Sequence, residues 1–393
     1  MKIIILKWNA YGMQDVTDGL KALSHDVFPI EFDKNNPRSN PEFESRLEKM
    51  ISDIKPDLVF SLNYFPIASL ICKKTDTRYV SWIYDNPYVL LYSYTVAFPT
   101  NYIFVFDRTQ YNEFHSNGIN TVYYLPLCSN ARRLSSYSDM DYFRKTKWYN
   151  RTDIAFVGSL YTEDHQFYNR IEHISDHSRG YLEGIMEAQS HVYGYNFIES
   201  LLDKSIIKEM QKDLPLTPNE DGVESEEWLF AQYVINRRIT GIERTRMLNL
   251  IGTKYEYDLY TVNPDLKLHN CYNHGAIESY EGSPYVFKTA KINLNFTLRS
   301  ITSGIPLRAF EIIGSGGFLL TNYQADFDDC FTADEDYVYF ESPDDMMAKI
   351  EYYLSHENER ALIAKNGLQK CLNEHTYEKR LQDIFKVVFE QNI

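Results

Sequence analysis

The sequence lacks any apolar run long enough to cross a membrane. Its 393 residues contain no stretch near the roughly 18 consecutive apolar residues that a spanning helix needs. The apolar start at residues 3–6 is too short for the hydrophobic region of a signal peptide, and no small-residue cleavage site follows it. We therefore expect a cytoplasmic protein whose chain begins with a buried strand.

Cysteine is also scarce, and its five positions show neither metal-ligand spacing nor a disulfide framework. The sequence has no GxxxxGK[ST] phosphate loop, no GxSxG nucleophile turn and no HExxH zinc pair. These absences argue against P-loop kinases and ATPases, serine hydrolases of that type and zinc proteases. We expect neither a metal ion nor a separate cofactor.

Positive charge is in deficit, because 40 Lys and Arg face 55 Asp and Glu, giving a net charge of -15. An acidic surface repels phosphate backbones, which argues against nucleic acid as the main partner. A local basic pocket for one diphosphate remains compatible with this charge. The hydrophobic share of 44% predicts a packed core, and the length is sufficient for two α/β domains.

Short apolar runs alternate with helical patterns in the first third of the chain. Such alternation predicts a parallel, doubly wound sheet, and apolar runs without polar alternation fit a sheet covered on both faces. The expected strands are residues 3–8, 26–32, 58–61, 79–84, 102–106 and 121–125. We assign residues 1–148 to this first domain.

A second α/β pattern follows a polar connection and opens with a strand that ends on Gly158. Residues 162–250 are mostly helical by pattern, and further strands are expected at 257–261, 291–296 and 318–321. We assign residues 149–375 to a second domain with residues 162–250 as a helical insertion. Residues 376–393 are expected to form a separate C-terminal helix.

The most informative stretch is a loop rich in small residues that leads into a predicted helix. The N–H groups and positive dipole end of a helix start suit an anion such as a diphosphate. Arg308 in the first turn can add a charge-assisted contact, and Glu311, three residues later, can accept hydrogen bonds from a ribose diol. The alternative is an Arg–Glu surface pair before a glycine helix end. The candidate binding residues here are Thr302, Ser303, Gly304, Arg308, Glu311, Gly316 and Gly317.

Further candidates follow other predicted strands. Gly158 and Ser159 end the first strand of the second domain, where glycine permits backbone approach to a ligand. Asn295 lies at the end of the strand at 291–296 and Arg299 just after it, so both project toward the same edge and Arg299 could reach a phosphate or a sugar. In the first domain Asp85 precedes an Asn-Pro turn, where it could act as a general base for an acceptor or cap its own turn.

The segment from Gly304 to Leu320 resembles the nucleotide-sugar signature of GT-B glycosyltransferases, which are built from two Rossmann-like domains. More closely, it is similar to the spore-maturation CgeB-type family of glycosyltransferase-like proteins. Residues 156–159, 291–296, 375–381 and the Asp85-Asn86-Pro87 turn add to the resemblance. It implies that Glu311 holds the nucleotide ribose, that residues 302–308 face the diphosphate or sugar, and that the last helix crosses back to the first domain.

One departure from the family pattern is the absence of an acid at Ser303-Gly304, where many retaining enzymes have a glutamate. The resemblance therefore implies transfer of a sugar, without metal, from a nucleotide-sugar donor to a glycan, protein or small-molecule acceptor, but not the stereochemistry. Two alternatives remain on the same fold: a sugar-nucleotide epimerase and a non-catalytic carbohydrate-binding protein. The helical insertion could shape the donor site or form a homodimer contact.

Overall fold

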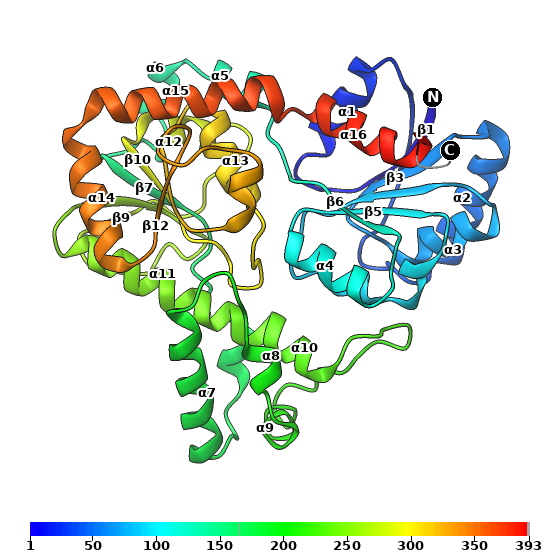
Figure 1. The fold of residues 1–393 in the computed structure, drawn as a ribbon, viewed down its shortest axis with the longest axis horizontal. Coiled ribbons are helices and arrows are strands. Elements are labelled where there is room, and N and C mark those ends of the chain that lie inside the picture. The colour runs from blue at the N-terminus through cyan, green and yellow to red at the C-terminus, as the bar shows by residue number, and fades with distance from the viewer. Residues whose placement is uncertain (164, 391–393) are drawn as a thin grey trace. The chain divides into compact units, whose positions relative to one another are not determined.

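A computed structural model of the protein describes residues 1–163 and 165–390, and they divide into two compact units (Figure 1). Unit 1 comprises residues 1–127, the segment 218–225 and the C-terminal residues from Thr376. Unit 2 comprises residues 128–217 and 226–375. The chain thus enters the second unit about twenty residues before the predicted boundary at 148. A short piece of the predicted helical insertion belongs to the first unit.

Unit 1 is built on a parallel sheet whose order is β2-β1-β3-β4-β5-β6. Its central strands are covered on both faces, because Ile3 to Leu6 in β1 and Leu58 to Phe60 in β3 are almost fully buried. The strands of the described chain in this unit are β1 Lys2–Lys7, β2 Asp26–Glu31, β3 Leu58–Leu62, β4 Tyr79–Trp82, β5 Asn101–Val105 and β6 Val122–Tyr124.

The helices of unit 1 connect successive strands, and the C-terminal helix packs beside the first of them. Leu381 and Tyr377 approach Gly19 on α1, and the Tyr377 ring lies 5.9 Å from the Trp82 ring. Residues 391–393 of the predicted C-terminal helix lie outside the described residues. The helices are α1 Met13–Ala22, α2 Pro41–Ile54, α3 Pro66–Lys74, η1 Val89–Tyr92, η2 Tyr94–Ala97, α4 Arg108–Ser116 and α16 Tyr377–Glu390.

Unit 2 has its own parallel sheet, in the order β12-β11-β10-β7-β8-β9. The chain starts in the middle of this sheet at β7, builds outward to β9 on one side and returns to β10 on the other. The order therefore reverses between β7 and β10. The described strands are β7 Ile154–Val157, β8 Tyr257–Tyr260, β9 Cys271–Asn273, β10 Ile292–Asn295, β11 Leu319–Asn322 and β12 Val338–Phe340.

A helical insertion separates β7 from β8 and has a hydrophobic core of its own, which includes Leu182, Met210 and Phe230. Figure 1 shows α7, α8 and α9 grouped at one end of α11, away from the strands of unit 2. The helices of this unit are α5 Ala131–Ser136, α6 Met140–Arg144, η3 Phe167–Arg170, α7 Asp176–Ser190, α8 Ile198–Leu201, α9 Lys204–Met210, α10 Glu226–Phe230, η4 Ala231–Ile235, α11 Asn236–Gly252, α12 Ser283–Thr289, α13 Leu307–Gly314, η5 Ala325–Asp329, α14 Pro343–Ser355 and α15 Glu357–Glu374.

The predicted fold class is confirmed. Two parallel sheets, each flanked by helices, form two Rossmann-like domains, and the second carries the helical insertion. None of the helices in residues 1–163 and 165–390 combines the length and the apolar character of a membrane span.

Gly317 tests how tightly the start of β11 is packed. A Cβ atom there would lie 2.5 Å from the Phe287 carbonyl oxygen and 2.8 Å from Asn293 Nδ2. Because a backbone atom would have to move, we expect Gly317→Ala to lower the free energy of unfolding by about 1–3 kcal/mol. Gly184→Ala on α7 is the control, since nothing lies within 4 Å of its Cβ, and it should raise stability by about 0.5–1 kcal/mol. Urea denaturation of both variants measures the difference, and equal stability would refute the packing argument.

Candidate functional site

The carboxyl edge of the sheet in unit 2 is where this fold offers a binding crevice. Ligands of doubly wound sheets bind outside the carboxyl ends of the strands, at the point where the strand order reverses. In unit 2 that point lies between β7 and β10. The structure brings Gly158 and Ser159, which follow β7, to the same edge as the loop 296–306, which follows β10.

Arg308 and Glu311 occupy the first turns of α13, whose start faces this edge. Nη1 of Arg308 lies 2.8 Å from Oε2 of Glu311, and the side chains are 25% and 6% exposed. This buried nitrogen faces the Glu311 carboxylate, whereas Nε and Nη2 of Arg308 have no hydrogen-bond partner among the described residues and remain available to a ligand. The Arg308 guanidinium also lies 5.3 Å from the centre of the Phe287 ring. The pair is therefore a largely buried one, not the solvated surface pair that was the alternative.

Hydrogen bonds to its backbone hold the loop before α13 in place. Gln324, just after β11, donates from Nε2 to the carbonyl oxygens of Ile301 and Gly304 at 3.2 and 3.1 Å. The Ser303 carbonyl accepts from the N–H of Asp326 at 3.0 Å. These contacts leave the loop that contains Thr302, Ser303 and Gly304 in one defined path at the entrance to α13.

Arg244 on α11 ties the ends of β7 and β10 together. Its Nε donates to the Phe296 carbonyl at 3.0 Å, Nη2 donates to the same oxygen, and Nη1 donates to the Ser159 carbonyl. Burial lowers the pKa of this guanidinium. The Ser159 hydroxyl in turn donates to Glu163 at 2.9 Å. Residues 158–159 are therefore held at the point of strand reversal by a cation that the sequence analysis did not single out.

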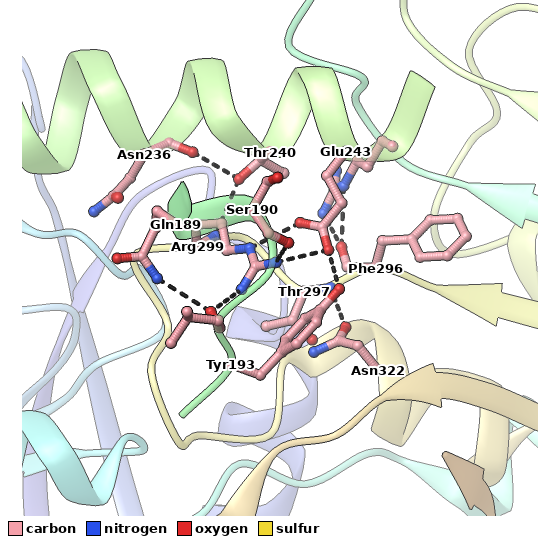
Figure 2. Close-up of polar contacts among 12 residues, drawn as sticks. Gln189, Ser190, Tyr193, Asn236, Thr240, Glu243, Phe296, Thr297, Arg299 and Asn322 are labelled. Atoms are coloured by element: carbon pink, nitrogen blue, oxygen red, sulfur yellow. Dashed lines mark hydrogen bonds and ion pairs between the residues drawn. The ribbon is translucent and has the colours of Figure 1, made fainter. Parts of the chain in front are cut away.

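The Arg299 side chain, expected to reach a phosphate or a sugar, makes most of its hydrogen bonds within the protein. Four of its five N–H donors are used inside the protein: Nε and Nη2 bind Glu243 at 2.8 and 2.9 Å, Nη1 binds the Val192 carbonyl and Nη2 the Ser190 carbonyl. Figure 2 shows the guanidinium enclosed by these groups. The Tyr193 hydroxyl donates to the same carboxylate, and burial together with the Glu243 charge raises the pKa of Tyr193.

Three further candidates have structural roles. The Asn295 amide donates to the Thr297 and Thr321 hydroxyls at 3.2 and 2.9 Å, which links β10 to β11. Gly316 takes a positive φ of 82° at the end of α13, and Gly317 packs against the Phe287 backbone. Because α13 runs back along the sheet, both glycines lie at the amino end of β11, the opposite edge from Arg308. The structure therefore separates them from the predicted site.

Asp85 in unit 1 follows the carboxyl end of β4 and is oriented by a neighbouring strand. Asn63, just after β3, donates from Nδ2 to Oδ2 of Asp85 at 2.7 Å, and its Oδ1 accepts from the N–H of Tyr84 at 2.8 Å. An amide on the adjacent strand thus directs the carboxylate.

The sequence analysis missed Gly241, Glu243 and Arg244, which make α11 part of the site. A Cβ at Gly241 would lie 3.0 Å from the Leu160 carbonyl, so this glycine allows the loop after β7 to approach the helix. The available signal was that Glu243 falls on the apolar stripe between Ile239 and Met247, at i,i+4 spacing. A charge in such a stripe indicates a buried polar contact.

Asp139 and Asp336 each have another aspartate two residues away in the sequence, and both are bonded to nearby groups of the protein. Asp139 accepts from the N–H of Tyr142 at the start of α6, and Asp336 binds the N–H of Thr332 and Lys370 Nζ. No three His, Cys, Asp or Glu side chains gather as metal ligands within the described ranges.

Comparison with known proteins gives a class. A family model described as Glycosyl transferase-like matches residues 230–386, which include the candidate site on α11 and α13. No curated protein matches the chain in sequence.

Solved structures of similar fold cover the whole chain. They include a glycosyltransferase from Rickettsia africae (10% identity, TM-score 0.54, 99% of this chain and 98% of that one). The Anabaena HepE protein in complex with UDP and glucose gives 9% identity and a TM-score of 0.56, over 99% and 100%. Sucrose-phosphate synthase from Thermosynechococcus elongatus gives 11% and 0.54, over 100% of both chains. The fold and the family model together support a GT-B glycosyltransferase, and therefore a transferase enzyme.

The Arg299–Glu243 pair should dominate the stability of this edge. Removing one member of a buried, hydrogen-bonded ion pair leaves the other charge uncompensated, which costs about 3–5 kcal/mol. We expect Arg299→Ala to lower the free energy of unfolding of unit 2 by that amount. The exposed pair of Lys254 and Glu351 is the control, and Lys254→Ala should leave the unfolding midpoint unchanged. Equal midpoints for the two variants in urea denaturation would contradict a central role for Arg299.

Proposed function

We propose that the protein transfers a sugar from a nucleoside diphosphate sugar, bound by unit 2, to an acceptor hydroxyl bound by unit 1. The observation that carries the proposal is the buried Glu311 beside Arg308 at the start of α13, at the edge where doubly wound sheets bind nucleotides. The family model covers this element, which favours a donor site here over a purely structural ion pair.

The chemistry of the pair suits the two polar parts of a nucleotide. A carboxylate accepts hydrogen bonds only, so Glu311 matches the two hydroxyl donors of a ribose. The N–H groups of the first turn of α13 and the Arg308 guanidinium supply positive charge for the diphosphate. When the bond between the anomeric carbon and the diphosphate oxygen breaks, the leaving group takes the electron pair, and this positive charge stabilises it.

On the acceptor side, Asp85 is the proposed base. Its carboxylate would take the proton as the acceptor oxygen forms the new bond to the anomeric carbon. The Asn63 amide donates to Oδ2 of this carboxylate and thereby orients it. Glycan, protein and small-molecule acceptors all offer such a hydroxyl.

The donor to test first is a UDP-sugar, since structures of similar fold hold UDP and UDP-glucose. We further propose that no metal is needed, because Arg308 and α13 provide the positive charge that a metal would otherwise supply. The relationship to the CgeB-type family, drawn from the motif at residues 304–320, is part of the same proposal. The cytoplasmic location and the homodimer remain predictions.

Glu311 gives the direct test of the donor site. Calorimetry with UDP, GDP, ADP and dTDP identifies the nucleotide that the wild-type protein binds. Because hydrogen bonds to a charged group contribute about 1.5–3 kcal/mol, Glu311→Ala should weaken binding about tenfold or more. Glu357→Gln, an exposed glutamate on α15, is the matched control and should bind as the wild type does. If no nucleotide binds, or if Glu311→Ala binds equally well, the assignment is wrong.

Asp85 tests the acceptor side separately. With the donor found by calorimetry, release of the nucleoside diphosphate is followed with water as the acceptor and with EDTA present. Asp85→Asn should lower the rate about 10²-fold or more while donor affinity stays unchanged. Asp76→Asn, an exposed position in the same unit, should leave the rate unchanged. A changed sugar without diphosphate release would instead identify an epimerase, and an unchanged rate in Asp85→Asn would exclude it as the base.

A further inference from the structure

An open pocket, with about 280 Å³ of empty space that includes open solvent, lies at the carboxyl edge of unit 2, between the helical insertion and the ends of β10 and β11. The loop after α7 forms one wall, the loop after β10 a second, and the residues after β11 a third. Thr302 joins this pocket to the loop that leads into α13. The lining residues that matter here are Gln189, Tyr195, Thr297, Thr302, Asn322 and Gln324.

The loop 192–197, which forms the wall from the helical insertion, is held at both ends by the side-chain amide of one buried residue. Gln189, 1% exposed at the end of α7, donates from Nε2 to the carbonyls of Val192 and Tyr195 at 3.1 and 2.9 Å. Its Oε1 accepts from the N–H of Phe197 at 2.9 Å. Every hydrogen bond that the structure gives this side chain is therefore made to the loop 192–197.

The two walls are also bonded to each other. Asn196 donates from Nδ2 to the Arg299 carbonyl at 3.1 Å, and the Arg299 guanidinium binds the Val192 carbonyl at 2.7 Å. The guanidinium also lies 3.9 Å from the Tyr193 ring (Figure 2). The loop 192–197 and the loop after β10 are therefore fixed against each other, as the walls of a preformed binding site are.

Tyr195 stands out from this rigid wall. Its side chain is 65% exposed, and within the described chain it makes no hydrogen bond or ring contact. The neighbouring Gly194 has a φ of +75°, which turns the loop at this point. The loop thus presents a large aromatic ring beside the pocket, and this ring makes no hydrogen bond or ring contact with the described residues. Such rings, apolar in body with one polar end, commonly serve to contact ligands.

The chemistry of the pocket is polar but uncharged. The lining includes the polar residues Thr297, Thr302, Asn322 and Gln324. Arg299 is the one charged side chain among the described residues of the lining, and Glu243 neutralises it. A phosphate would find no net positive charge here. A neutral polyol, which offers many hydroxyl groups and apolar C–H faces, fits both the polar lining and the Tyr195 ring.

We propose that this pocket receives the sugar ring of the donor, with Tyr195 lying against its C–H face, and that the insertion thereby selects the sugar. The inference rests on the proposed function, since it assigns the sugar half of the donor whose diphosphate lies at Arg308 and α13. The two halves of the donor therefore bind at different places. The anionic diphosphate lies at Arg308 and the start of α13, and the neutral sugar lies in the pocket without net charge.

The test compares a nucleoside diphosphate with its own sugar nucleotide: UDP with UDP-glucose, GDP with GDP-mannose and ADP with ADP-glucose. Calorimetry measures both affinities for wild type, Tyr195→Ala and Tyr195→Phe. Tyr195→Ala should weaken sugar-nucleotide binding about five- to tenfold and leave diphosphate binding unchanged, because only the sugar contact is lost. Tyr195→Phe keeps the ring and should stay within about twofold of wild type. Tyr181→Ala, a partly exposed tyrosine on α7, is the control for the insertion and should change neither affinity.

Three results would overturn the proposal. Equal loss of both affinities in Tyr195→Ala would put the ring against the nucleotide, and no loss in either would remove it from the site. In both cases the wild-type protein still binds a donor, so the proposed function stands. If the wild type binds none of the three pairs, the proposed function fails and the sugar pocket fails with it.

Discussion

The contact between Arg299 and Glu243 is the interaction on which the carboxyl edge of unit 2 depends. Both side chains are buried, and charges of this kind persist inside a protein only when they are paired and hydrogen-bonded. Once Arg299 is placed against Glu243, its remaining donors determine where the carbonyls of Ser190 and Val192 must lie. The pair therefore sets the path of two loops at once, the end of α7 and the segment that leads toward α13. Solvating Glu243 or Arg299 would require both loops to move together.

The arginines of this edge divide between structure and ligand according to their partners. Arg299 has a carboxylate, and Arg244 has the carbonyls of Phe296 and Ser159 at the ends of β10 and β7. Both guanidinium groups are therefore engaged by groups of the protein itself. Arg308 pairs with Glu311 by distance alone, with a buried Nη1 that has no well-formed hydrogen bond. The donors on Nε and Nη2 of Arg308 have no partner among the described residues, so an anionic ligand could accept hydrogen bonds from them. The same argument favours Glu311, with one partner, over Glu243, with several, as the candidate ligand-binding carboxylate.

Local pattern was sufficient for the elements that local physics decides. The apolar runs at β7, β10 and β11 and the helix at residues 307–314 follow from period and propensity. The three-residue strands β9 and β12 went unpredicted, because so short a run carries no period. The buried contacts of Arg299 were not predicted, because its partners lie 56 and 107 positions away in the sequence. Gly316 and Gly317 were misjudged because a glycine pair before a strand reads alike whether it touches a ligand or another backbone.

The insertion between β7 and α11 changes what this fold can select. The crossover between adjacent parallel strands needs only one helix, and here α11 supplies it. The additional helices α7 to α10 build a separate core, and from it one loop reaches the edge where the sheet's own loops end. In the proposed function α13 and Arg308 bind the anionic half of the donor, so the insertion does not have to bind charge. Its loop can then vary in shape and side chain without disturbing the groups proposed to hold the diphosphate. A domain of this construction keeps one part of its ligand constant while the other is set by a segment added to the fold, and loops held on a rigid scaffold are where such specificity is usually found.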